Sequence, residues 1–251
     1  MIPRIIHFCW FGRGQKPKIV EKCIRSWKEN CPNYKIFEWT EDNFDIESAP
    51  QYVRDAYNDG KWAFVSDYVR FVVLVKYGGI YLDTDEELLD SLDSFLNHTA
   101  FIGTEDGFHI SAGLMGCVKG YSLFSDFRDS YSELSFYNPD GAQNMTTVVD
   151  MLTEWCKEKG YQPGNEYQEI SGLAVYPSDY FYPLSNADGI MRKTGHSVAI
   201  HWFAGSWVPE ERKKKKKKRQ FKNRLKPKIV AIIGNERFER LKKLLHYEAD
   251  D

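Results

Sequence analysis

A long apolar stretch that ends at two glycines and leads directly into an acidic triplet constrains this chain most strongly. Residues 61–77 are mostly apolar, and Gly78-Gly79 follows them. Their β-branched residues would suit a strand, but the length and the terminal glycines favour a buried helix. A short strand over residues 80–82 then runs into Asp83-Thr84-Asp85. The pattern predicts a helix, a tight turn and a strand with carboxylates at its carboxyl end.

The N-terminal part of the chain has the pattern of a strand, a helix and a second strand. Residues 2–9 suit a buried strand, a helix is expected to begin at Pro17, and residues 34–39 alternate as a strand. This order is typical of an α/β fold in which helices cover a mixed, mostly parallel sheet. Further strands are expected over residues 99–103, 110–118, 168–183 and 198–203, and further helices over 121–132 and 143–158.

Charge divides the 251 residues into an acidic body and a basic tail. Residues 212–251 hold sixteen basic and five acidic side chains, a net charge of +11, which leaves −13 on residues 1–211 because the whole chain carries −2. We therefore expect one domain over residues 1–211 and a separate tail over 212–251. The basic run at 213–218 suggests a linker, and Asn235 suggests the cap of an amphipathic helix after it.

The basic tail predicts contact with a polyanion. A solvated linker is one alternative, and nucleic-acid binding is another. Phe221 is the one aromatic residue between Arg212 and Lys228, which gives little support for base stacking, so we expect no nucleic acid. Anionic lipids attract each basic residue near the surface by about 1 kcal/mol. We therefore expect residues 212–251 to bind an anionic membrane surface.

Composition narrows the class of protein. Apolar residues make up 42% and charged residues 28%, which excludes a disordered chain. No apolar run approaches the roughly 20 residues that span a bilayer, and the N-terminus lacks the pattern of a signal peptide. We expect a cytoplasmic protein that is peripheral on the inner face of the cell membrane. The five cysteines include no C-x-x-C pair, so we expect them to be reduced and mostly buried.

Asp83 and Asp85 are candidate metal ligands. In an extended chain residues i and i+2 point to the same side, and two carboxylates there repel each other unless a cation lies between them. Oxygen ligands of this type suit Mg²⁺ or Mn²⁺. Ligands of open α/β sheets also bind at the carboxyl ends of strands. The alternative is a polar turn in which Glu86 and Glu87 add further surface acid.

Other polar residues stand in apolar surroundings. Asp67 and Arg70 share one face of the predicted helix, either as an internal ion pair or as groups that converge on a ligand such as a phosphate. His201 lies on the last apolar strand, either as a core residue or as a third protein ligand of a Mn²⁺-type ion. Gly205 and Ser206 follow it and offer donors to a diphosphate.

Three stretches together resemble a known family. They are residues 2–12, the block formed by 63–70 and 77–85, and residues 201–207. Over about residues 2–208 the chain is similar to glycosyltransferase family 32, which includes capsular-polysaccharide sugar transferases and a group of mannosyltransferases. The clostridial glucosylating toxins are similar over the middle block. The resemblance implies a GT-A fold with a metal-dependent D-x-D motif, and transfer from a nucleotide sugar with retention at the anomeric carbon.

The resemblance also implies which residues hold the nucleotide. Phe8 and Trp10 would lie against the base, and Tyr81 would contact the nucleotide. Asp67 and Arg70 would hold the ribose or sugar and the diphosphate.

Around the metal, the resemblance places Asp83 against the ribose and the sugar and near the ion, and gives Asp85 direct contact with Mn²⁺ or Mg²⁺. His201 would complete the metal site. The residues that would close over the diphosphate are Gly205, Ser206 and Trp207.

The residue on the opposite face of the sugar is not fixed by these motifs. Asp106, Gln143 and Asn144 are candidates. Gly141-Ala142 stands where family members often carry Gly-Pro, which departs from the family pattern. Asp106 also suits an exposed acidic turn.

Taken together, the residues and the resemblance predict a metal-dependent retaining hexosyltransferase. UDP-glucose or UDP-galactose is the first expectation for the donor, and GDP-mannose is the second. The expected acceptor is a lipid-linked glycan in bacterial capsule or lipopolysaccharide synthesis. A phosphatase that uses D-x-D as its nucleophile is disfavoured, because such enzymes carry the motif on their first strand and residues 2–9 contain no aspartate. The remaining alternative is a non-enzymatic binding module driven by the tail.

Overall fold

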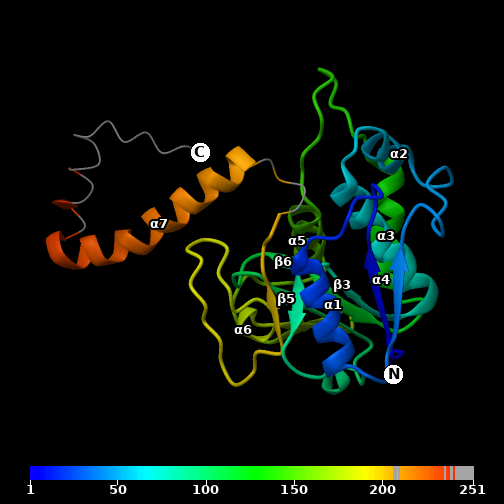
Figure 1. Cartoon of the computed structure of the whole chain (residues 1–251), viewed down its shortest axis with the longest axis horizontal. Coiled ribbons are helices and arrows are strands. Elements are labelled where there is room, and N and C mark those ends of the chain that lie inside the picture. The colour runs from blue at the N-terminus through cyan, green and yellow to red at the C-terminus, as the bar shows by residue number, and fades with distance from the viewer. Residues whose placement is uncertain (206–207, 209, 235, 238–239, 241–251) are drawn as a thin grey trace. The chain divides into compact units, whose positions relative to one another are not determined.

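The computed structural model describes residues 1–205, 208, 210–234, 236–237 and 240. The chain forms two compact units, one made of residues 1–184 and 191–207 and the other of residues 185–190 and 208–251. In Figure 1 the ribbon is coloured by residue number, so the residues of each unit can be followed along the chain.

A seven-stranded mixed sheet is the centre of the first unit. Its strand order is β2-β1-β3-β6-β5-β8-β7. The strands are β1 (Ile5–Cys9), β2 (Lys35–Trp39), β3 (Gly79–Leu82), β5 (Ala100–Thr104), β6 (Ile110–Cys117), β7 (Gln168–Ile170) and β8 (Leu173–Tyr176). Three neighbouring pairs are parallel and three are antiparallel. Strands β4 (Glu86–Leu88) and β9 (Ala199–His201) form a separate antiparallel pair.

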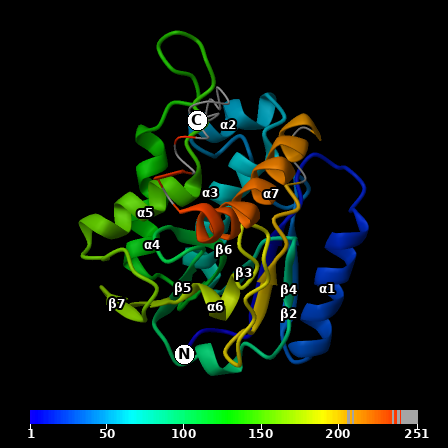
Figure 2. The ribbon, with the colours of Figure 1, turned by 90° about the vertical axis from the view of Figure 1, so that its left-hand side faces the viewer.

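Helices cover both faces of the sheet, as Figure 2 shows. Side chains alternate across β3, so that Tyr81 joins one apolar cluster while Ile80 and Leu82 join the other. The first cluster is shared with helices α2 (Gln51–Asn58), α3 (Trp62–Tyr77), α4 (Ser122–Asp129) and α5 (Val148–Glu158). The second includes Trp27 of helix α1 (Lys18–Asn30) and Phe181 of the short helix α6 (Ser178–Phe181). The expected α/β fold with a mixed sheet between helices is confirmed. The expectation of a mostly parallel sheet is wrong, because β6 runs antiparallel to both of its neighbours and β7 runs antiparallel to β8.

Most expected elements are present, with shifted ends. The helix expected over residues 61–77 is α3, and Pro17 lies directly before α1. The helix expected over 143–158 begins only at Val148, because Thr147 caps it through a capping box with Asp150. The strand expected over 168–183 is wrong in part, since β7, β8 and α6 divide that segment. The five cysteines are free and buried, as expected.

The second unit is built on helix α7 (Glu210–Ile233). The expectation of a linker at 213–218 is wrong, because this run is helical and lysine is a good helix former. Side chains of Gln220, Asn223 and Arg224 donate to carbonyl oxygens of residues 186–189 at 2.6–3.1 Å. Asn235 and most of the helix expected after it lie outside the described residues. No helix in the described part of the chain is long and apolar enough to cross a bilayer.

Candidate active site

The acidic triplet lies in a tight turn at the carboxyl end of β3. Gly78 and Gly79 have φ values of +68° and +109°, which lets the chain reverse directly from α3 into β3. Asp83 N–H donates to the carbonyl oxygen of Gly113 at 2.7 Å, and Glu86 N–H donates to that of Asp83 at 2.9 Å. The first bond continues the pairing with β6 and the second closes the turn. Both fix the backbone that carries Asp83 and Asp85.

Arg70 links the helix to this turn. Its Nη2 lies 2.6 Å from Asp67 Oδ1 and 3.4 Å from Asp83 Oδ1, and its Nη1 donates to the carbonyl oxygen of Ala112 at 2.8 Å. The guanidinium also stacks on Tyr81 with 4.6 Å to the ring centroid. Tyr81 is itself buried, and its hydroxyl donates to Asp83 Oδ1 at 3.2 Å. Burial raises the pKa of Asp67 to about 7, although Arg70 opposes the rise.

Asp85 is hydrogen-bonded to residues of the segment 201–204, near the end of the first unit. Its Oδ1 lies 3.1 Å from His201 Nε2, and its Oδ2 accepts the N–H of Ala204 at 2.7 Å. Its backbone oxygen accepts the N–H of Trp202 at 3.0 Å. Burial alone would raise the pKa of Asp85 and lower that of His201, but the ion pair between them reverses both shifts. Residues that are 116 positions apart therefore meet at one point.

Carboxyl groups outnumber basic groups here. Burial raises the pKa values of Asp67, Asp83, Glu86 and Glu105, and neighbouring carboxylates of this set add to the rise for Asp67, Asp83 and Glu86, whereas His201 lowers the pKa of Asp85. Arg70 and His201 are the basic partners. Within the described ranges, no three or more His, Cys, Asp or Glu side chains are arranged as a metal site. The surplus of buried carboxyl groups over basic groups and the mixed oxygen and nitrogen donors nevertheless fit a divalent cation. Asp83, Asp85 and His201 are the residues that would hold it.

Glu86 is the functional candidate that the sequence pattern missed. The expectation of a surface acid at this position is wrong, because Glu86 is 0% exposed. Its strand β4 pairs with β9, which turns the side chain inward beneath Gly113. A Cβ at Gly113 would lie 3.0 Å from Glu86 Oε1 and 3.1 Å from Asp83 Oδ2, so the glycine leaves room for both carboxyl groups. Burial raises the pKa of Glu86 well above its ordinary value.

The three candidates for the opposite face of the sugar each make a hydrogen bond or ion pair within the described residues. Asp106 is 49% exposed on its side chain and pairs with His109 at 2.8 Å. Gln143 donates to Asp59 at 2.8 Å, and Asn144 donates to the carbonyl oxygen of Ser135 at 3.3 Å. The neighbouring Glu105 is the acid whose charge acts on His201 and Glu86, and it accepts a hydrogen bond from Ser111 at 3.2 Å.

The two aromatic residues predicted to lie against the base differ in the exposure of their side chains. Phe8 is buried and packs edge-on against Trp27, with ring centroids 5.4 Å apart. Trp10 is partly exposed, and its Nε1 donates to the carbonyl oxygen of Gly14 at 2.7 Å. Gly205 has a φ of +55°. Ser206 and Trp207 lie outside the described residues.

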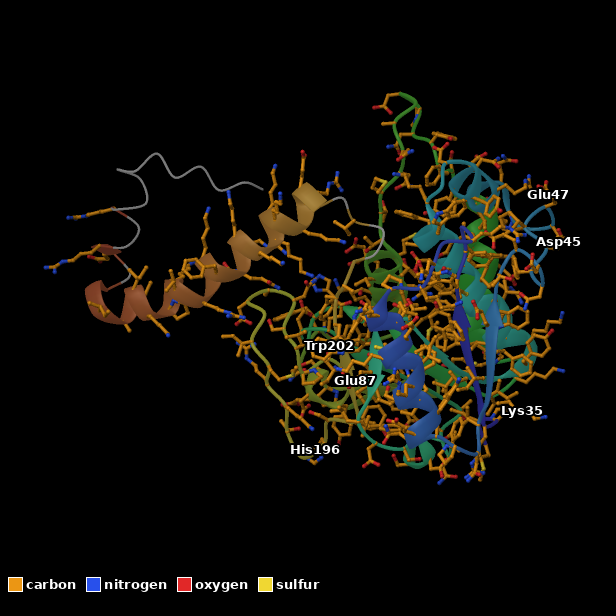
Figure 3. The ribbon with its side chains drawn as sticks, in the orientation of Figure 1. Lys35, Asp45, Glu47, Glu87, His196 and Trp202 are labelled. Atoms are coloured by element: carbon orange, nitrogen blue, oxygen red, sulfur yellow. The ribbon has the colours of Figure 1, made fainter. Side chains whose placement is uncertain are left out.

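A small polar cluster holds the segment after His201. Trp202 Nε1 donates to Glu87 Oε2 at 2.8 Å, and Lys22 Nζ lies 2.6 Å from the same oxygen. The Lys22 ammonium also lies 4.6 Å from the Trp202 ring centroid. Figure 3 labels Glu87 and Trp202. The cluster fastens β9 to α1 and so fixes the chain on which His201 stands.

Comparison with known proteins finds sequences that are similar to parts of this chain. Residues 17–102 match the family described as the glycosyltransferase sugar-binding region containing the DXD motif. The inositol phosphoceramide mannosyltransferase 3 of Schizosaccharomyces pombe is 34% identical over 131 residues, which are 48% of this chain and 34% of that protein. This chain therefore spans about a third of that relative's length. An uncharacterized glycosyltransferase of Acanthamoeba polyphaga mimivirus is 25% identical over 83% of this chain and 85% of its own.

Among solved structures, the PaToxG glycosyltransferase superposes with a TM-score of 0.51 at 17% identity. The match covers 63% of this chain and 70% of that one, and it shows that the two share a fold. The DXD triplet of that family description corresponds to Asp83-Thr84-Asp85, within the matched residues. Over residues 17–102 the chain is therefore similar to the glycosyltransferases that carry a DXD-containing sugar-binding region.

Proposed function

We propose that this protein transfers a hexose from a nucleotide sugar to a lipid-linked glycan, with a divalent cation and with retention at the anomeric carbon. The observation that carries the proposal is the meeting of Asp85 with His201 beside the Asp67, Arg70 and Asp83 cluster at the carboxyl end of β3. Ligands of open α/β sheets bind at this end of the strands.

The residues of the site suit departure of a nucleoside diphosphate. A bound divalent cation supplies positive charge where the leaving phosphate becomes negative. Asp83, Asp85 and His201 would hold it. Arg70 is a fixed guanidinium in the same cluster, and its geometry suits phosphate oxygens. Asp67, together with Asp83 beside the cation, would accept hydrogen bonds from hydroxyl groups of the ribose or the sugar.

The donor and the acceptor are inferred from the sequence and from a relative. UDP-glucose or UDP-galactose is the donor that we favour from the sequence, and the mannosyltransferase relative supports GDP-mannose as the alternative. The name of that relative includes a lipid, inositol phosphoceramide, which supports a lipid-linked acceptor. We place the reaction in bacterial surface polysaccharide synthesis.

Donor hydrolysis tests the proposal without an acceptor. Purified protein is mixed with UDP- and GDP-sugars, with and without Mn²⁺, and released nucleotide is measured. We expect metal-dependent release from one donor, and loss of at least about 100-fold in Asp85→Ala, because its carboxylate then no longer holds His201 or the cation. Asp126→Ala removes an exposed acid on α4 and serves as the control. Equal release by wild type and Asp85→Ala would contradict the proposal.

Helix α7 supports a peripheral membrane location. Phe221, Leu225, Ile229 and Ile232 follow one another at helical spacings of four, four and three residues, and they are 64%, 37%, 37% and 82% exposed. Basic residues occupy twelve of the positions 212–228, and no acidic residue occurs among them. A helix with an exposed apolar stripe among cations suits the interface of an anionic bilayer. We propose that α7 holds the enzyme on the inner face of the cell membrane.

Vesicle sedimentation tests this location. We expect the full-length chain to sediment with vesicles that contain anionic lipid and to remain in solution with zwitterionic ones. The double variant Phe221→Ser/Ile232→Ser should bind on the order of tenfold or more weakly, because each apolar side chain that enters the interface contributes about 1.5–3 kcal/mol at full burial. Phe108→Ser removes an aromatic residue of similar exposure, 61%, from the first unit and should bind like wild type. Unchanged binding of the double variant would exclude the apolar stripe as the contact.

A further inference from the structure

Two buried polar groups beside the predicted metal ligands face each other without a hydrogen bond. Glu86 Oε1 and Oε2 and His201 Nδ1 are inaccessible to solvent, and none has a hydrogen-bond partner among the described residues. Glu86 and His201 are direct cross-strand neighbours in the β4–β9 pair. His201 Nδ1 lies 4.0 Å from Glu86 Oε1. Leaving such groups unpaired is costly, so the arrangement calls for an explanation.

Strand pairing brings one donor to Glu86. His201 Nε2 faces Asp85 at 3.1 Å, so Nδ1 is the ring nitrogen on the side of Glu86. The Tyr182 hydroxyl accepts the N–H of Leu114 at 2.9 Å and makes no hydrogen bond to Glu86 within the described residues. Gly113 contributes no side chain. His201 Nδ1 is therefore the donor at the cross-strand position.

We propose that Glu86 is a positioning residue that accepts a hydrogen bond from His201 Nδ1–H and so directs the Nε2 lone pair toward the cation held with Asp85. The inference rests on the proposed metal-dependent function. A histidine that binds a metal through one nitrogen carries its hydrogen on the other, and a carboxylate commonly accepts it. A small rotation of the ring that shortens the 4.0 Å separation to about 2.8 Å completes the bond.

A purely structural role predicts a different behaviour. If Glu86 affects only the stability of the fold, replacing it by an amide or an apolar residue changes the free energy of unfolding. Metal binding would then stay unchanged. A purely electrostatic role predicts that removal of any nearby carboxylate weakens metal binding to the same extent. Glu105 provides the comparison, because its charge also acts on His201 although the pair lacks the cross-strand contact.

Metal titration of the full-length chain separates these roles. Mn²⁺ is titrated into wild type, Glu86→Gln and Glu105→Gln with saturating UDP, and in a parallel series with GDP, and free Mn²⁺ is measured by electron paramagnetic resonance. We expect a 10- to 100-fold loss of Mn²⁺ affinity in Glu86→Gln, about the effect of removing an outer partner of a metal-bound histidine. Glu105→Gln should lose several-fold less. Glutamine has the shape of glutamate, and thermal unfolding without metal checks that each variant folds.

The hydrogen bond from His201 Nδ1–H gives a second measurement that does not depend on activity. In protein with ¹⁵N-labelled histidine and bound Mg²⁺, hydrogen lies on Nδ1 in both proteins, and we expect the Nδ1–H proton resonance at lower field in wild type than in Glu86→Gln. If wild type binds the metal and Glu86→Gln matches it in affinity and in this resonance, the role of Glu86 is excluded while the proposed function stands. Equal losses in Glu86→Gln and Glu105→Gln exclude positioning in favour of charge alone. A wild type that binds no Mn²⁺ overturns both proposals.

Discussion

His7 shows how one side chain of β1 is fixed in its neutral form. Its Nε2 lies 3.0 Å from the carbonyl oxygen of Gly78, and its Nδ1 accepts the Nε1–H of Trp39 at 3.1 Å. The neutral ring therefore donates once and accepts once, and a second hydrogen would have no acceptor at Nδ1. Burial lowers the pKa of His7 to about 4, although the bond to Gly78 opposes the fall.

This pKa predicts acid sensitivity. The unfolded chain binds a proton at His7 below about pH 6.5, whereas the folded chain does so only near pH 4. Stability from His7 is therefore complete above pH 6.5 and declines by about 3 kcal/mol as the pH falls to about 4. Glutamine can donate and accept as the neutral ring does but does not titrate.

Urea unfolding at pH 7 and pH 4 measures the effect. Wild type should lose about 3 kcal/mol more of its unfolding free energy over this interval than His7→Gln does. His196→Gln, at an exposed position, serves as the control and should follow wild type. Parallel losses in wild type and His7→Gln would show that His7 is not the group responsible.

At the scale of elements, the junction between α3 and β3 sets the position of the acidic triplet. A Cβ at Gly79 would lie 2.7 Å from the backbone oxygen of Ile5 and 3.2 Å from His7 Nε2. The φ of +109° is also one that residues other than glycine rarely adopt. The close approach is what allows β3 to pair with β1 immediately after the helix ends.

Gly79→Ala should destabilise the fold, because its Cβ would crowd Ile5 and its positive φ would strain the backbone. We expect a loss of about 3 kcal/mol or more, since backbone strain and displacement of a packed strand each cost on the order of 1–3 kcal/mol. Gly141→Ala is the matched control, because Gly141 also has a positive φ, +82°, but open space around its Cα. It should lose only about 1–2 kcal/mol. Urea unfolding followed by tryptophan fluorescence measures both, and equal losses would exclude crowding at Ile5.

Helices and strands were predictable from the sequence where apolar runs and terminal glycines mark them locally. The helix α3 and the strand that leads to Asp83 were predictable because an apolar run of helical length ends at two glycines. The short helix α2 and strand β4 lacked such signals and were not expected. The burial of Glu86 depends on the pairing of β4 with β9, more than 100 residues later, so no local pattern reveals it. The proximity of Asp85 and His201 came from the family resemblance for the same reason.

At the scale of the whole molecule, the apolar cores and the acidic site belong to one unit. Both apolar clusters consist of residues up to position 203, and the hydrogen-bond partners of the Asp85 carboxylate are His201 and Ala204. The second unit contributes helix α7 and the bonds between that helix and residues 186–189. We therefore expect that donor hydrolysis by the first unit does not require the membrane binding proposed for α7.

Ending the chain after residue 207 tests this separation. The truncated protein should keep a cooperative thermal transition, because it retains every residue of both apolar clusters. It should hydrolyse the donor in a Mn²⁺-dependent manner at about the wild-type rate, and it should no longer sediment with anionic vesicles, since the basic residues of α7 and its apolar stripe are absent. Calorimetry, nucleotide release and sedimentation measure the three properties. Loss of hydrolysis with an unchanged thermal transition would show instead that residues after 207 complete the donor site, and would contradict the division of roles between the two units.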